Sequence, residues 1–129
     1  MVALDANIRF AGVANKLGKI IASSYRSGLV PLLSKEETEQ SIPQHALRVS
    51  PPPMLESKLG RTVYSVTTFE KIRRVIIPLY DLYGNTSSLL LVSFDIETHN
   101  YDSIIQDRIL PLVRGNDDRQ RTERRHHQI

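Results

Sequence analysis

The sequence has no cysteine, which excludes disulfide bonds and thiolate metal ligands. It also lacks a long hydrophobic run. The longest strictly apolar stretch is Leu89–Val92, whereas a bilayer-spanning helix needs about 20 apolar residues. The N-terminal residues Met1–Asn7 have neither the basic start nor the apolar centre of a signal peptide. We therefore expect a cytoplasmic protein with no membrane-spanning segment.

What the chain does contain is typical of a globular domain. Its 129 residues can bury a real core, and 40% apolar with 24% charged residues argue against a chain that is disordered throughout. We expect one α+β domain over residues 1–115. A disordered basic tail is predicted over residues 116–129, because these residues show no apolar periodicity.

The positive charge is unevenly spread. The formal net charge is +3, and residues 114–129 hold five Arg against three Asp or Glu, so the rest of the chain carries only +1. A nucleic-acid-binding domain needs its basic residues on one folded face. We therefore expect no nucleic-acid partner, and a solubility role for the tail arginines Arg119, Arg121, Arg124 and Arg125.

Alternating apolar residues near the N-terminus predict a β-hairpin over Ile8–Tyr25. The first strand, Asn7–Ala14, places every second residue on one face, and Asn15–Gly18 is a turn signal before the second strand, Lys19–Tyr25. Small residues weaken strand propensity, so we interpret them as room for a helix that packs closely on the hairpin. These residues are Ala11, Gly12, Ala14 and Ala22.

A capping-box pattern, Ser34 with Glu37, predicts the start of a helix that runs to residue 49. Pro43 conflicts with this helix because an interior proline costs roughly 3 kcal/mol, so we expect a kink or two shorter segments. A short helix over residues 54–59 is predicted next, with Gly60 as its C-cap. The expected buried face of the first helix comprises Ile42, Ala46, Leu47 and Val49.

Three more strands are predicted after this point, over Arg61–Thr67, Lys71–Tyr80 and Ser88–Phe94. Pro78 suggests an edge position or the end of regular pairing, and Leu89–Val92 is typical of a strand buried on both faces.

A final helix is predicted over Tyr101–Val113, with Asn100 as its N-cap. Its expected buried stripe comprises Tyr101, Ile104, Ile105, Ile109 and Leu112. The resulting order β-β-α-β-β-β-α predicts an α+β fold: a five-stranded antiparallel sheet with flanking helices on one or both faces, whose last three strands form a meander.

Phe94–Thr98 resembles the first acidic motif of the DEDD-type exonucleases. On a strand, Asp95 and Glu97 would share a face with His99, and the two carboxylates could hold divalent cations for phosphodiester hydrolysis. The two further acidic motifs of that family are missing, since few residues follow Thr98 and Asn100–Asp102 lies too close to it. We therefore favour a strand that leaves the core through polar residues, with a metal-dependent nuclease as an alternative.

No other group of residues forms a complete catalytic, cofactor-binding or metal-binding pattern. Ser23 and Ser24 lack a nucleophile-elbow turn and a suitably placed base. Lys71, Arg73 and Arg74 place positive charge on a strand, which we interpret as a solvated strand edge rather than a phosphate-binding group. We do not interpret the isolated His45, or the adjacent pair His126 and His127, as metal ligands. We expect no catalytic residues, no cofactor and no metal.

The hairpin also carries a family resemblance. Ile8–Val13 and Gly18–Ala22 resemble the opening strands of a family of archaeal, thaumarchaeal-type proteins that has no assigned function. The resemblance covers roughly residues 7–113 and identifies a family rather than an activity. It continues through Glu36–Glu39, Ala46–Val49, Ser57–Gly60 and Tyr64–Ser65.

The predicted order of elements resembles that of the roadblock dynein light-chain fold and of profilin-like sensor folds. Roadblock modules usually begin with an additional helix, which the residues before Asn7 are too few to form. The resemblance implies dimerisation through a helix and an edge strand, and binding to small GTPases.

These observations favour a non-catalytic protein-interaction or regulatory module, which we expect to be a homodimer. The first alternative is a small-molecule sensor of the profilin-like or PAS-like type, with its ligand between sheet and helix. The second alternative is the metal-dependent nuclease that would use Asp95 and Glu97.

Overall fold

The computed structural model describes residues 1–114. The expected basic tail over 116–129, with its arginines and the His126–His127 pair, lies outside the described residues. The elements follow in the order 3₁₀ helix Val2–Leu4, β1 Ile8–Asn15, β2 Ile20–Tyr25, α1 Lys35–Val49, α2 Pro53–Leu59, β3 Ser65–Thr68, β4 Ile72–Tyr80, β5 Thr86–Asp95, α3 Tyr101–Ile104 and the π-helical segment Ile105–Ile109.

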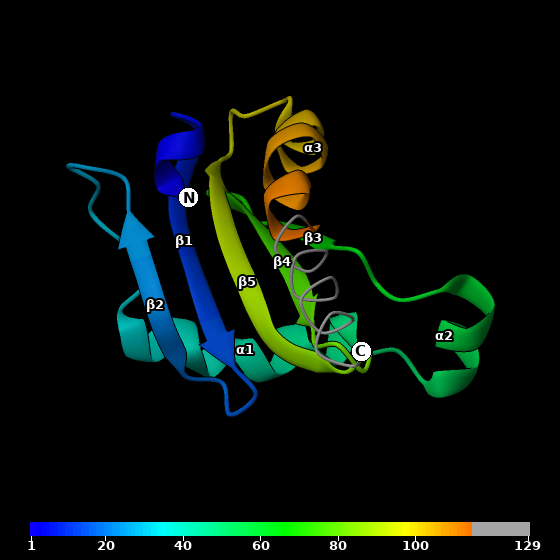
Figure 1. The fold of residues 1–129 in the computed structure, drawn as a ribbon. Coiled ribbons are helices and arrows are strands. Elements are labelled where there is room, and N and C mark those ends of the chain that lie inside the picture. The colour runs from blue at the N-terminus through cyan, green and yellow to red at the C-terminus, as the bar shows by residue number, and fades with distance from the viewer. Residues whose placement is uncertain (115–129) are drawn as a thin grey trace, which may run out of the picture.

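One five-stranded sheet organises the molecule, with the strand order β2-β1-β5-β4-β3 and antiparallel pairing throughout. Helix α1 lies behind the sheet and α3 in front of it in Figure 1, while α2 projects away from the sheet and has no buried residue. The predicted α+β class, the five-stranded antiparallel sheet and the final meander are therefore confirmed. No helix in the described part of the chain is both long and apolar enough to cross a bilayer.

Strand β5 lies at the centre of the sheet and is buried from Leu89 to Phe94. Its side chains alternate between two apolar clusters, one on each face of the sheet. The cluster under α3 contains Val75, Ile77, Leu90, Val92, Phe94, Ile104, Ile105 and Ile109, among others. The cluster under α1 contains Phe10, Ala14, Ile42, Val49, Ile76, Leu89 and Leu91.

The start of α1 is as the sequence predicts. The Ser34 hydroxyl accepts the Glu37 N–H (3.1 Å), and the Glu37 carboxylate accepts the Ser34 N–H (3.0 Å). The helix is one element through Pro43, so of the two expected outcomes, a kink or two shorter segments, the second is wrong. Pro43 is exposed, and the capping box together with the buried Ile42 and Val49 holds the helix on both sides of it.

Strand β3 is shorter than predicted, since it pairs only from Ser65 to Thr68. Its first residue lies opposite Ile76, so it ends before it could reach Pro78 on the neighbouring strand. Pro78 therefore lies in an interior strand, paired with Leu89 on one side only. The proline needs no N–H partner on the β3 side, which explains its tolerance there.

The C-terminal helix contains a π-helical turn that the sequence pattern did not predict. A π-turn inserts an extra residue, which rotates the residues after it around the helix axis. As a result Leu110 is buried, whereas Leu112, expected in the buried stripe, is 49% exposed. Asn100 stands at the N-cap position but its side chain makes no capping hydrogen bond.

Packing explains the small residues of the hairpin in two different ways. Ala14 packs in the cluster that α1 covers, as expected. At Gly12, however, an added Cβ would lie 2.6 Å from the Phe10 ring. This ring packs on Tyr25 with a centroid distance of 4.9 Å, so the missing side chain makes room for Phe10 rather than for a helix.

Thr98 supplies a test of the packing under α3. Its side chain is 3% exposed and its hydroxyl has no hydrogen-bond partner among the described residues. Thr98→Val removes a buried polar group without a partner, so we expect the free energy of unfolding in urea to rise by about 1 kcal/mol.

Thr38→Val is the matched control, because that hydroxyl is also buried but donates to the Ser34 carbonyl (2.9 Å). We expect this variant to lose about 1 kcal/mol. An equal loss in both variants would contradict the assignment of an unpaired hydroxyl at Thr98.

Candidate functional site

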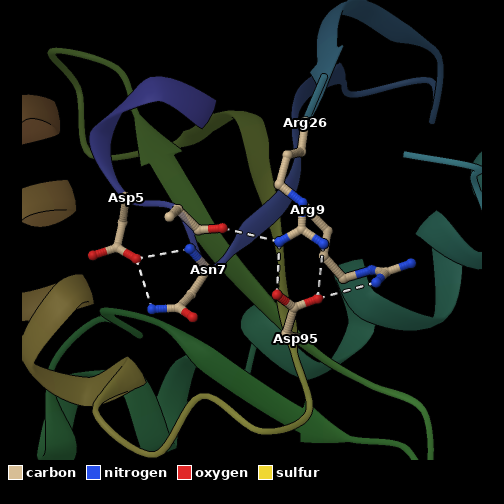
Figure 2. Close-up of polar contacts among 6 residues, drawn as sticks. Asp5, Asn7, Arg9, Arg26 and Asp95 are labelled. Atoms are coloured by element: carbon tan, nitrogen blue, oxygen red, sulfur yellow. Dashed lines mark hydrogen bonds and ion pairs between the residues drawn. The ribbon is translucent and has the colours of Figure 1, made fainter. Parts of the chain in front are cut away.

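An ionic cluster at the C-terminal end of β5 joins β1, β5 and Arg26, the residue that follows β2 (Figure 2). The Asp95 carboxylate accepts the Arg9 Nη1 at 3.0 Å, and it accepts Nη1 and Nη2 of Arg26 at 2.6 and 3.1 Å. Arg26 also donates to the Ala6 carbonyl at 2.9 Å. The two guanidinium groups thus hold one carboxylate, one of them through both of its terminal nitrogens.

A β-bulge brings Arg9 into this cluster. Strand β1 advances two residues, from Ile8 to Phe10, while β5 advances one, from Phe94 to Ser93, so Arg9 is the extra residue. Arg9 and Phe10 consequently line the same pocket. Arg26 directly follows β2, where its N–H donates to the Arg9 carbonyl at 2.8 Å.

The charges of the cluster stabilise each other. The hydrogen bond from Arg26 lowers the pKa of Asp95 below its ordinary value, partial burial acts in the opposite direction, and the bond from Arg9 lowers it further. The same bond to Asp95 raises the pKa of Arg26. Asp95 is therefore an ionised structural anion rather than a free ligand.

A row of cross-strand neighbours lies next to the cluster on the face that α1 covers. The pairing Phe10–Ser93 and the pairing Ser93–Arg74 place these side chains side by side on β1, β5 and β4. Together with Arg9 they line an inner pocket of about 40 Å³. Residues from the loop between β2 and α1 line its other side: Leu29, Pro31, Leu32 and Leu33.

The inner pocket continues into a wider groove of about 570 Å³, with which it shares Leu32, Leu33, Ile72 and Arg74. Arg74 is only 6% exposed and donates to the Ser41 hydroxyl of α1 at 3.0 Å. Burial lowers the pKa of its guanidinium. Our interpretation of this arginine as part of a solvated strand edge is therefore wrong, because β4 is an interior strand.

The nuclease motif does not form a metal site in the described part of the chain. Strand β5 ends at Asp95, so Glu97 lies beyond it in a turn and is exposed. The carboxylate of Asp95 is taken up by the two arginines, and no group of three acidic or histidine side chains meets within residues 1–114. His99 is exposed beside this turn.

The remaining candidate functional residues of the sequence analysis do not come together in one site. Ser23 and Ser24 are exposed on β2. Arg73 points to the face opposite Arg74, where it donates to the Thr98 carbonyl and lies 4.2 Å from the centre of the Tyr101 ring. The side chain of His45 lies outside what the structure describes.

No protein-family model and no curated protein sequence matches the chain. Solved structures that match include MglB in a tetrameric arrangement, at 14% identity and a TM-score of 0.61, covering 84% of this chain and 75% of that one. The gliding protein MglB of Thermus thermophilus matches at 12% identity and a TM-score of 0.59, covering 84% and 76%.

A third match is the inducer-binding domain of the Acinetobacter transcription factor PobR, a double mutant in complex with 3-hydroxybenzoic acid. It has 16% identity and a TM-score of 0.51, covering 93% of this chain and 90% of that one. At such identities the likeness concerns the fold alone, which is the roadblock-like five-stranded α+β fold expected from the order of elements.

Asp95→Asn tests the ionic cluster. We expect a loss of about 1–2 kcal/mol in the free energy of unfolding at neutral pH, since the cluster is only partly buried and solvent screens it. Folding lowers the pKa of Asp95 below its ordinary value of 3.8. The ionised carboxylate therefore adds to the free energy of unfolding above pH 3.8, and this added stability is lost as the pH falls through the lowered pKa of the folded state.

Urea unfolding of wild type and variant from pH 7 to pH 2 measures this. The difference between the two proteins should shrink below about pH 4. Glu97→Gln, an exposed carboxylate of the same motif, is the control and should leave stability within about 0.5 kcal/mol. A difference that stays constant down to pH 2 would refute the assigned role of Asp95.

Proposed function

We propose that this chain is a non-catalytic interaction module with a regulatory role, and that it forms a homodimer through the outer edge of β3. The observation that carries the proposal is the open sheet. Within residues 1–114, β2 and β3 each pair with one neighbouring strand only. An edge strand presents backbone groups that can pair with another chain.

The geometry of β3 favours it over β2 as the pairing edge. The Phe69 N–H donates to the Ile72 carbonyl at 2.8 Å, and alternation along an antiparallel ladder then directs the backbone N–H and C=O of Val66 and Thr68 outward. Val63 and Phe69 flank this strand and are each 45% exposed. Ser41 of α1 lines the same groove as Phe69, so a helix adjoins the edge.

The fold resemblance extends the proposal. Roadblock modules resemble one another in pairing through a helix and an edge strand, and one of the matching structures is MglB in a tetrameric arrangement. By the same analogy we propose a small GTPase as a further partner, a cytoplasmic location, and kinship with the archaeal family that the hairpin resembles.

A second candidate function is a small-molecule sensor. The observation that favours it is the groove between the sheet, α1 and the loop before α1, since a pocket in this position offers both apolar walls and polar groups. The PobR domain, which has a related fold, is in complex with a small ligand.

Light scattering coupled to size-exclusion chromatography tests the homodimer. We expect the wild type to run as a dimer at high micromolar concentration, and Thr68→Pro to weaken association at least tenfold because it removes an outward N–H. Ser23→Pro is the matched control on the other edge. The bond from the Arg26 N–H to the Arg9 carbonyl implies that the Ser23 N–H also points outward.

The control variant should remain dimeric. Val63→Asp changes the same surface without altering the backbone of β3, and should weaken the dimer even if Thr68→Pro fails to fold. A monomeric wild type would sink the proposal, and dissociation by Ser23→Pro alone would move the interface to β2.

A further inference from the structure

The inner pocket combines polar groups with an apolar rim that is partly open to solvent. Arg9, Ser93 and Arg74 reach it from three adjacent strands, while leucine side chains of the loop between β2 and α1 line its outer side. Its volume of about 40 Å³ is several times the roughly 10–15 Å³ that one water molecule needs. A group the size of a carboxylate therefore fits.

The Ser93 hydroxyl is the first of two groups with unused hydrogen-bonding capacity there. Ser93 is 6% exposed, and its hydroxyl makes no hydrogen bond to any described residue. The hydroxyl is not one of the fully enclosed polar atoms of the described residues, so it reaches the open space of the pocket, where a ligand can accept a hydrogen bond from it. Its position between Phe10 and Arg74 places it at the floor of the pocket.

The second group is the Arg9 guanidinium. It donates one hydrogen bond, from Nη1 to Asp95, and its remaining N–H groups have no hydrogen-bond partner among the described residues. The bulge that places Arg9 in the cluster also makes it line the pocket. A guanidinium fork with free donors is suited to a planar oxyanion.

The charges around the pocket favour an anion. Arg9 and Arg74 line the inner pocket, which has no acidic lining residue, and Asp95 beside it is shared by Arg9 and Arg26. In the wider groove the charges of Glu70 and Lys71 are opposite in sign. The burial that lowers the pKa of Arg74 disfavours its charged form, and an anion nearby would favour it. Asp95 in turn repels a second negative charge, so a monoanion fits better than a phosphate dianion.

We propose that the inner pocket binds the carboxylate of a small monocarboxylic acid through Arg9, Ser93 and Arg74, while the apolar part of the acid lies in the wider groove along Leu32 and Phe69. This inference rests on the second candidate function, that the groove binds a small molecule. The wider groove of about 570 Å³ lies in the usual range of small-molecule sites, about 300–1,000 Å³.

The test is a titration of the full chain, labelled with ¹⁵N, with phenylacetate and separately with its neutral analogue phenylacetamide, followed by amide shifts in NMR spectra. We expect phenylacetate to bind with a Kd on the order of 1 mM, with the largest shifts at Ser93, Leu33 and Arg74. Phenylacetamide should bind at least tenfold more weakly, because it lacks the charge that the arginines recognise.

Ser93→Ala should weaken phenylacetate binding about tenfold. Ser88→Ala is the matched control, since this serine lies on the same strand but outside both pockets of the groove, and it should bind as the wild type does. Equal binding of acid and amide would overturn the carboxylate assignment and leave the sensor function standing. If neither compound shifts any amide signal, both the carboxylate assignment and the sensor function are refuted.

Discussion

Burial of β5 on both faces is the constraint on which the rest of the structure depends. Six consecutive residues, Leu89–Phe94, are buried, so the strand needs a neighbour on each edge and a layer on each face. Strands β1 and β4 supply the neighbours, while α1 and α3 supply the layers. The hydrophobic effect acting on this one segment therefore requires most of the surrounding architecture.

The end of β5 is where this apolar strand becomes polar, and the site forms there. Ser93 and Asp95 alternate with Phe94 and point to the face that α1 covers. The bulge in β1 adds an arginine on that face, and the residue after β2 adds another. A carboxylate that the sequence pattern associates with metal ions is thereby part of an arginine cluster that stabilises the fold.

The groove and the proposed pairing edge are adjacent. Phe69 follows β3 and also lines the wider part of the groove, which Ser41 of α1 borders on the other side. The groove and the edge strand, on which the two proposed functions rest, thus adjoin each other. The ionic cluster at the end of β5 lies next to the inner pocket. Its hydrogen bonds connect β1, β5 and Arg26, and so hold in place the strands that line the pocket.

Local signals in the sequence determined the hairpin, the capping box at Ser34, the buried central strand and the order of elements, because each depends on neighbours within a few residues. Only the tertiary structure decided the site. Arg9 and Arg26 meet Asp95 across 86 and 69 residues of chain. The bulge and the π-turn, which re-aim Arg9 and bury Leu110, result from packing between distant segments and leave no periodic pattern in the sequence.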